Sequence, residues 1–99
     1  MRTPIINNKK KLFEICKRND IVFLAIFGSF VKGNFTKESN IDLLVRFSKT
    51  KSLLELVRLE RVLSGVLGRK IDLLTEASIS PYLREKIKKE MEVFYERTR

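Results

Sequence analysis

An uninterrupted apolar run, IVFLAIF over residues 21–27, constrains the fold more than any other part of the sequence. A strand that is covered on both faces has this pattern, because neither face carries polar side chains. Gly28 ends the run. Sheets of this kind are typical of proteins in which strands alternate with helices. Because 99 residues are enough for one domain and no more, we expect a single domain over residues 1–99.

The rest of the chain alternates between helical and extended patterns. Two further apolar segments predict strands, IDLLVRF at 41–47 and KIDLLT at 70–75. Apolar residues at helical spacing, together with turn residues, predict four helices: 8–19, a short one from Ser29 to about Gly33, 52–67, and a last one from Ser80-Pro81 to about Tyr95. The expected fold is therefore α/β (α+β), with a small mixed sheet of about three strands flanked by about four helices.

Local signals mark the ends of two of these helices. Ser52 and Glu55 have the spacing of a capping box, and Gly68 can end the same helix. Ser80 followed by Pro81 predicts the start of the last helix. We interpret the apolar stripe of that helix as core or partner surface; its members are Leu83, Ile87, Met91 and Phe94 with Tyr95.

Basic residues outnumber acidic residues by 21 to 12, which gives a formal net charge of +9. Such a surface favours polyanions or an acidic protein partner through long-range attraction. However, the basic residues are spread along the chain and interleaved with glutamates. This distribution is typical of solvated helix faces rather than of a nucleic-acid groove. Nucleic acid is therefore not the expected partner.

Histidine and cysteine usage excludes several classes of site. The sequence has no histidine, which rules out histidine general bases, Ser-His-Asp or Cys-His chemistry, and His-ligated zinc. The single cysteine, Cys16, cannot form a disulfide within the chain, and its apolar helical setting predicts a core position. No apolar run reaches the roughly 20 residues that span a membrane, and the N-terminus lacks a signal-peptide core. We therefore expect a cytoplasmic protein with no membrane partner.

Gly28 and Ser29 lie between the apolar strand and a predicted helix. Glycine lets a ligand approach the backbone closely. The start of a helix offers N–H groups and the positive end of a dipole to a phosphate, and a serine hydroxyl can donate one more hydrogen bond. On its own, this pair is more typical of a plain strand-to-helix turn than of a phosphate site.

Three polar side chains fall on the other two predicted strands. Asn40 and Asp42 are two residues apart and therefore point to the same face, and Asp72 has the equivalent position on a neighbouring strand. Burying an unpaired carboxylate is costly, so each needs a cation or hydrogen bonds. Either aspartate alone could simply pair with Arg46, Lys70 or backbone N–H groups. Both together, beside a phosphate-type turn, indicate metal-assisted phosphoryl transfer, because Mg²⁺ prefers carboxylate and phosphate oxygens.

Gly28-Ser29, ten intervening residues and Asn40-Ile41-Asp42 together resemble the GS-x10-D-x-D signature of minimal nucleotidyltransferases. These are the smallest members of the DNA polymerase β-like nucleotidyltransferase superfamily. The segment KIDLLTEASISPYLREKIKKEMEVFYE, from 70 to 96, is similar to the third-aspartate strand and closing helix of that family. The resemblance covers about residues 8–96 and implies the nucleotidyltransferase fold.

The resemblance also implies a role for each matching residue. Gly28 and Ser29 would bind the phosphates of ATP, the substrate. Asp42 and Asp72 would hold Mg²⁺, with two ions in an active member, and would act in catalysis as metal ligands and general base. The first metal aspartate of the family falls on Asn40, which offers a carbonyl oxygen but no charge. Loss of that charge should cost at least the roughly 10–100-fold that groups supporting a metal ligand are worth.

Members of this family are commonly paired with a small helical HEPN-type ribonuclease toxin and transfer AMP from ATP to one of its tyrosines. The resemblance therefore implies a protein adenylyltransferase that acts as an antitoxin. Asn40 leaves a second interpretation open: a catalytically impaired binding module that neutralises the toxin by forming a complex. A third, a nucleic-acid-binding adaptor, is supported only by charge and predicts a steep loss of affinity with salt. The choice between a homo- and a hetero-oligomer stays open.

Overall fold

The computed structural model describes residues 8–97. The predicted single domain over residues 1–99 extends beyond this range at both ends. In chain order the elements are α2 (Lys9–Arg18), β1 (Ile21–Phe27), α3 (Ser29–Lys32), β2 (Ile41–Phe47), α4 (Leu53–Leu67), β3 (Ile71–Thr75), the 3-10 turn η1 (Glu76–Ser78), α5 (Pro81–Glu90) and β4 (Glu92–Glu96). Within residues 8–97, no helix is long and apolar enough to cross a membrane.

The described strands form one mixed sheet with the order β3-β2-β1-β4. β1 is antiparallel to both of its neighbours, β2 and β4, whereas β2 and β3 are parallel. The parallel pair needs a crossover connection, and α4 provides it. The predicted α/β class and mixed sheet are confirmed, but the sheet has four strands rather than about three.

The extra strand comes from the predicted last helix, which is wrong over its final third. α5 begins at Pro81 as expected but ends at Glu90, and Glu92–Glu96 form β4 instead. Phe94 and Tyr95 therefore belong to a strand rather than to a helical stripe. The segment EVFYE holds a β-branched residue and two aromatic residues, which suit a half-buried strand, and β1 offers it an edge with which to pair.

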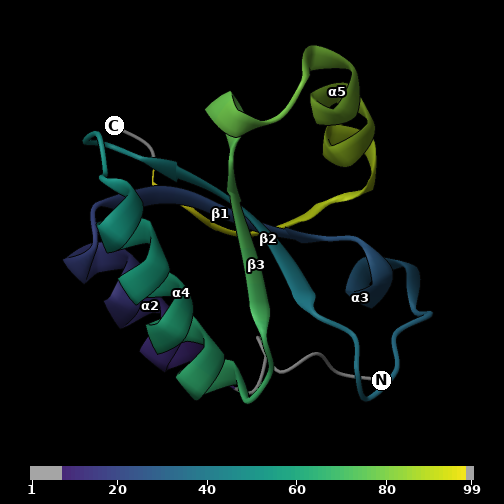
Figure 1. The fold of residues 1–99 in the computed structure, drawn as a ribbon, viewed down its shortest axis with the longest axis horizontal. Helices are drawn as coiled ribbons and strands as arrows, with labels where there is room; N and C mark the ends of the chain where they lie inside the picture. The colour runs from purple at the N-terminus through teal and green to yellow at the C-terminus, as the bar shows by residue number, and fades with distance from the viewer. Residues whose placement is uncertain (1–7, 98–99) are drawn as a thin grey trace.

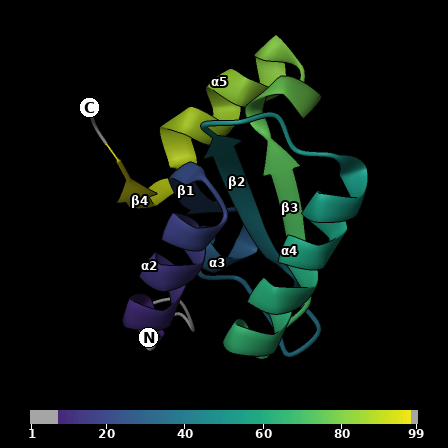
Figure 2. The same ribbon diagram turned by 90° about the vertical axis from the view of Figure 1, so that its left-hand side faces the viewer.

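Helices cover both faces of the sheet, as the pattern of β1 predicts. α2 and α4 lie side by side on one face, and α5 lies on the other (Figures 1 and 2). The larger core cluster packs under α2 and α4 and includes Leu12, Cys16, Leu24, Leu43 and Leu63. A smaller cluster under α5 is formed by Phe23, Ala25, Leu44, Ile79 and Ile87. β1 contributes side chains to both clusters, and Cys16 is buried as expected.

The predicted signals at the ends of α4 are confirmed. The Ser52 hydroxyl accepts the Glu55 N–H at 3.2 Å, and the Glu55 carboxylate accepts the Ser52 N–H at 2.9 Å. Gly68 ends the helix with a left-handed φ of 71°, a conformation that glycine adopts without strain. Because this turn directs the chain into β3, it sets the register in which Asp72 reaches the sheet.

Candidate functional site

Strand register brings the predicted polar residues together at one end of the sheet. Asp42 lies opposite Asp72 in the parallel β2–β3 pair. On its other side Asp42 lies opposite Phe27, the last residue of β1, so the Gly28 turn begins directly beside it. Asn40 immediately precedes β2. The two aspartates, Asn40, Gly28 and Ser29 are all partly buried.

The carboxylates of Asp42 and Asp72 lie close enough to interact with each other. Burial raises the pKa of Asp42 above its ordinary value, and the charge of Asp72 and a hydrogen bond between the two carboxyl groups raise this pKa further. Arg46 is instead paired with Glu76 at 3.0 Å. Within residues 8–97 no ion pair joins either aspartate to a basic side chain. Simple pairing with Arg46 or Lys70 therefore does not explain the two aspartates.

Asn40 completes this polar cluster. Its side-chain amide donates a hydrogen bond to Oδ2 of Asp72 at 3.1 Å. Because the amide nitrogen faces Asp72, the amide carbonyl oxygen is the atom of Asn40 that could bind a cation. The side chain thus supports Asp72 but adds no negative charge to the cluster.

Gly28 is the position at which only a glycine fits. Its φ of 81° and ψ of −148° lie close to a region of backbone conformation that is essentially limited to glycine. A Cβ atom at this position would also clash with Oδ2 of Asp42. Its carbonyl accepts the N–H groups of Val31 and Lys32, both at 3.1 Å. The N–H groups of Ser29 and Phe30 come before these first helical hydrogen bonds of α3, so they can serve a ligand.

The oxygen ligands in this cluster fit one magnesium ion that a nucleotide also coordinates. Asp42 and Asp72 supply two carboxylates and Asn40 one amide oxygen, the hard oxygen ligands that Mg²⁺ prefers. Within the described part of the chain, no group of three or more His, Cys, Asp or Glu residues could hold a metal. Such an ion would therefore take its remaining ligands from phosphate oxygens and water. Two carboxylates also balance the charge of one divalent ion, so a second ion would depend on the phosphates for its charge balance.

Arg69, in the turn between α4 and β3, is a supporting residue that sequence reasoning missed. Its Nη1 atom donates hydrogen bonds to three backbone carbonyls of the loop before Asn40: Thr36 at 2.8 Å, Lys37 at 3.2 Å and Ser39 at 3.3 Å. Its guanidinium also lies 5.0 Å from the ring centroid of Phe30, in α3. Arg69 thus links the Asn40 loop, α3 and the start of β3. The only sequence signal was its place directly after the helix-ending Gly68.

Comparison with known sequences identifies the family of this fold. The profile of the family "Polymerase beta, Nucleotidyltransferase" matches residues 10–99. A Methanocaldococcus jannaschii protein, MJ0435, named provisionally as a protein adenylyltransferase, is 42% identical over 79 residues, which cover 80% of this chain and 85% of the relative. A match of this length within 99 residues always includes residues 21–79, so it contains the Gly28 turn and both strands that carry the aspartates.

Solved structures share the same fold. One, assigned provisionally as a minimal nucleotidyltransferase, superposes with a TM-score of 0.78 at 32% identity and covers 89% of this chain and 90% of its own. A Shewanella oneidensis complex, described as a tri-AMPylated HEPN toxin with an MNT antitoxin, superposes with a TM-score of 0.69 at 20% identity and covers 90% of this chain and 70% of its own. At that identity, the second likeness concerns the fold alone.

Proposed function

The chain belongs to the polymerase beta nucleotidyltransferase family, and we propose that it is a Mg²⁺-dependent protein adenylyltransferase that acts as an antitoxin. Its substrates would be ATP and a tyrosine of a HEPN-type toxin. Relatives named as protein adenylyltransferases support the reaction. The AMPylated toxin in the Shewanella complex supports the acceptor.

The observation that carries this proposal is the paired carboxylates of Asp42 and Asp72 beside the Gly28 turn. Gly28 and Ser29 would hold the nucleotide phosphates through backbone N–H groups and the serine hydroxyl. Asp42, Asp72 and the Asn40 carbonyl would hold Mg²⁺, which when bound supplies charge neutralisation at the phosphates. The pKa of Asp42 is raised first by burial and then by the neighbouring Asp72 carboxylate, and a bound divalent cation would oppose both effects by favouring the charged form.

The chemistry would need little from the chain beyond positioning and one proton acceptor. The tyrosine oxygen attacks the α-phosphorus of ATP, and the bond from that phosphorus to the bridging oxygen of pyrophosphate breaks. The phenolic proton passes to a carboxylate, for which Asp72 is the candidate. The products are AMP-tyrosine and pyrophosphate. This assignment uses no histidine, in keeping with a sequence that has none.

Asn40 favours a second candidate function, a binding module that neutralises the toxin without modifying it. In this chain an amide donates to Asp72 at the position where the family's signature has a carboxylate. The cluster therefore carries one negative charge fewer for metal binding. Weaker metal binding would lower the rate of transfer while leaving the fold, and any docking surface, unchanged.

Transfer of labelled AMP tests the two candidates. The chain, Asn40→Asp and Asp42→Asn would each be incubated with α-labelled ATP, Mg²⁺ and a HEPN-type toxin. The proposed enzyme labels the toxin with both the natural chain and Asn40→Asp, and Asp42→Asn abolishes the label. Labelling by Asn40→Asp alone identifies the natural chain as the impaired binding module. If no version labels the toxin, the proposed adenylyltransferase activity is wrong.

A further inference from the structure

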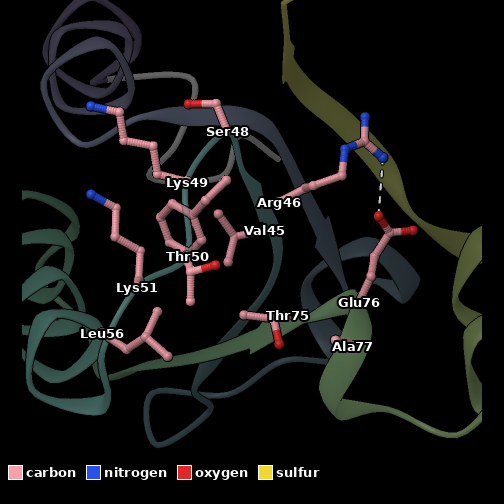
Figure 3. A pocket seen from close by; sticks show the side chains of 11 residues that line it. Val45, Arg46, Ser48, Lys49, Thr50, Lys51, Leu56, Thr75, Glu76 and Ala77 are labelled. Carbon is pink, nitrogen blue, oxygen red and sulfur yellow. Dashed lines mark hydrogen bonds and ion pairs between the residues drawn. The ribbon is translucent and has the colours of Figure 1, made fainter.

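A cavity lies at the end of β2 and β3 away from the carboxylates. It has a volume of about 550 Å³ and lies between the end of β2, the following loop and the start of α4. Figure 3 shows Leu56 and Thr75 at its wall, with Lys49 and Lys51 projecting together beside them. Val45, the lining residue of β2 nearest to Asp42, follows it by three positions, which is about 10 Å along a strand. The cavity is thus separate from the proposed nucleotide site.

Exposed apolar side chains flank Leu56 in the first turns of α4. Leu53 is 78% exposed, Leu54 60% and Val57 39%. Leu56, between them in the sequence, lines the cavity. Apolar side chains gathered around a hollow on an otherwise charged surface are typical of protein interaction sites. We call Leu53, Leu54, Val57 and the cavity the α4 face.

Positive charge predominates around the α4 face. Both glutamates of α4 are engaged within the molecule: Glu55 accepts the Ser52 N–H at 2.9 Å, and Glu60 accepts the Leu73 N–H at 3.2 Å. By contrast, Arg58 and Arg61 form no ion pair with any residue of 8–97. They follow Leu54 and Val57 at a spacing of four, so each lies one helical turn beyond an exposed apolar residue.

We propose that the α4 face is the docking surface for the protein partner, and that the partner presents an acidic surface with an apolar side chain that enters the cavity. The unpaired arginines favour carboxylates, and the exposed leucines and the cavity favour an apolar anchor. A second copy of this chain is a poor occupant, because two copies would each bring a net charge of +9. This inference rests on the proposed function for the existence of a partner.

Docking here would leave the carboxylate cluster open. The partner and the nucleotide would then not compete for the same residues. This arrangement suits both candidate functions. A bound toxin could be neutralised by complex formation alone, and a tyrosine on a projecting segment could still reach the open site.

Charge substitutions in the apolar part test the α4 face. Leu53→Glu and Val57→Glu each place a carboxylate against the proposed acidic partner. Leu83→Glu is the matched control, since Leu83 is 40% exposed, about as much as Val57, but lies on α5, on the other face of the sheet. We expect the first two variants to weaken binding of the HEPN-type partner at least tenfold by calorimetry, and Leu83→Glu less than threefold. Melting temperatures and Mg·ATP affinity should match those of the natural chain.

A second pair tests the charges. Arg61→Glu should slow association with the partner several-fold at low salt, whereas Lys89→Glu, an equal charge change on α5, should not. A complex that tolerates Leu53→Glu and Val57→Glu as well as Leu83→Glu overturns the α4 face but leaves the proposed function intact. A natural chain that forms no complex overturns both. A complex that forms without AMP transfer would contradict the proposed adenylyltransferase activity but would still support the docking surface. Self-association lost in Leu53→Glu would identify a second copy as the occupant instead.

Discussion

Gly28 allows the proposed phosphate turn to lie directly against the Asp42 carboxylate, because glycine has no Cβ atom. Gly28→Ala would force an unfavourable backbone conformation and drive the new Cβ into the Asp42 carboxylate. A residue held in such a conformation costs about 1–3 kcal/mol, so we expect a lower free energy of unfolding and lost Mg·ATP binding. Gly65→Ala is the control, because Gly65 lies in α4 with open space around it. That change should raise stability by up to about 1 kcal/mol. Equal affinity of Gly28→Ala and Gly65→Ala for the nucleotide would show that Gly28 is not part of the nucleotide site.

Asp42 makes the stability of the protein depend on pH and on metal. Because its pKa is raised in the folded state, its favourable contribution is complete below the ordinary aspartate pKa and is lost as the pH rises through the folded value. Asp42→Asn should therefore raise the melting temperature at pH 7 without Mg²⁺, and this gain should disappear in acid. Mg²⁺ should raise the melting temperature of the natural chain but not of the variant.

Asp20 is the control for Asp42, because its pKa is shifted in the opposite direction. A hydrogen bond from Lys51 lowers the pKa of Asp20, so its contribution is present at neutral pH and lost in acid. Asp20→Asn should therefore lower the melting temperature at pH 7. The same direction of change in both asparagine variants would contradict the electrostatic account of Asp42.

Arg69 holds the 34–40 loop in place through hydrogen bonds to its backbone carbonyls. Arg69→Ala removes three hydrogen bonds to loop carbonyls and the contact with the Phe30 ring. Hydrogen bonds to a charged group contribute about 1.5–3 kcal/mol, and we expect a loss in this range at most, because the donor is partly exposed. Hydrogen exchange should rise at the amides of 36–39, whereas Arg61→Ala should change neither quantity. Unchanged exchange in the loop would show that Arg69 does not hold it.

At the scale of helices, strands and turns, the features that depend on neighbouring residues were predicted correctly from the sequence. The apolar run of β1, the capping box of α4 and the Gly28 turn each depend on residues a few positions apart, and each was found where expected. β4 was missed because EVFYE has a spacing compatible with a helix and becomes a strand only by pairing with β1, about 70 residues away. Arg69 was missed for a related reason, since its acceptors are backbone carbonyls that leave no pattern in the sequence.

At the scale of the whole molecule, Cys16 reports whether the domain opens as one unit. It is fully buried between α2 and the sheet, and burial raises the pKa of its thiol to about 12. A thiol reagent reacts with the thiolate, so the folded protein should be inert. Labelling of Cys16 should then follow the population of opened molecules.

Nucleotide should protect Cys16 only if α2 opens together with the site. α2 contributes no residue to the carboxylate cluster, and it packs on β1 and α4. If unfolding is cooperative, Mg·ATP at 100 times its dissociation constant stabilises the protein by about 2.7 kcal/mol and should slow labelling about 100-fold. The rate of reaction with a coloured disulfide reagent, with and without Mg·ATP, measures this directly, and Asp42→Asn should show no slowing. An unchanged rate in the natural chain, at a concentration where binding is verified, would mean that α2 detaches while the nucleotide site stays folded.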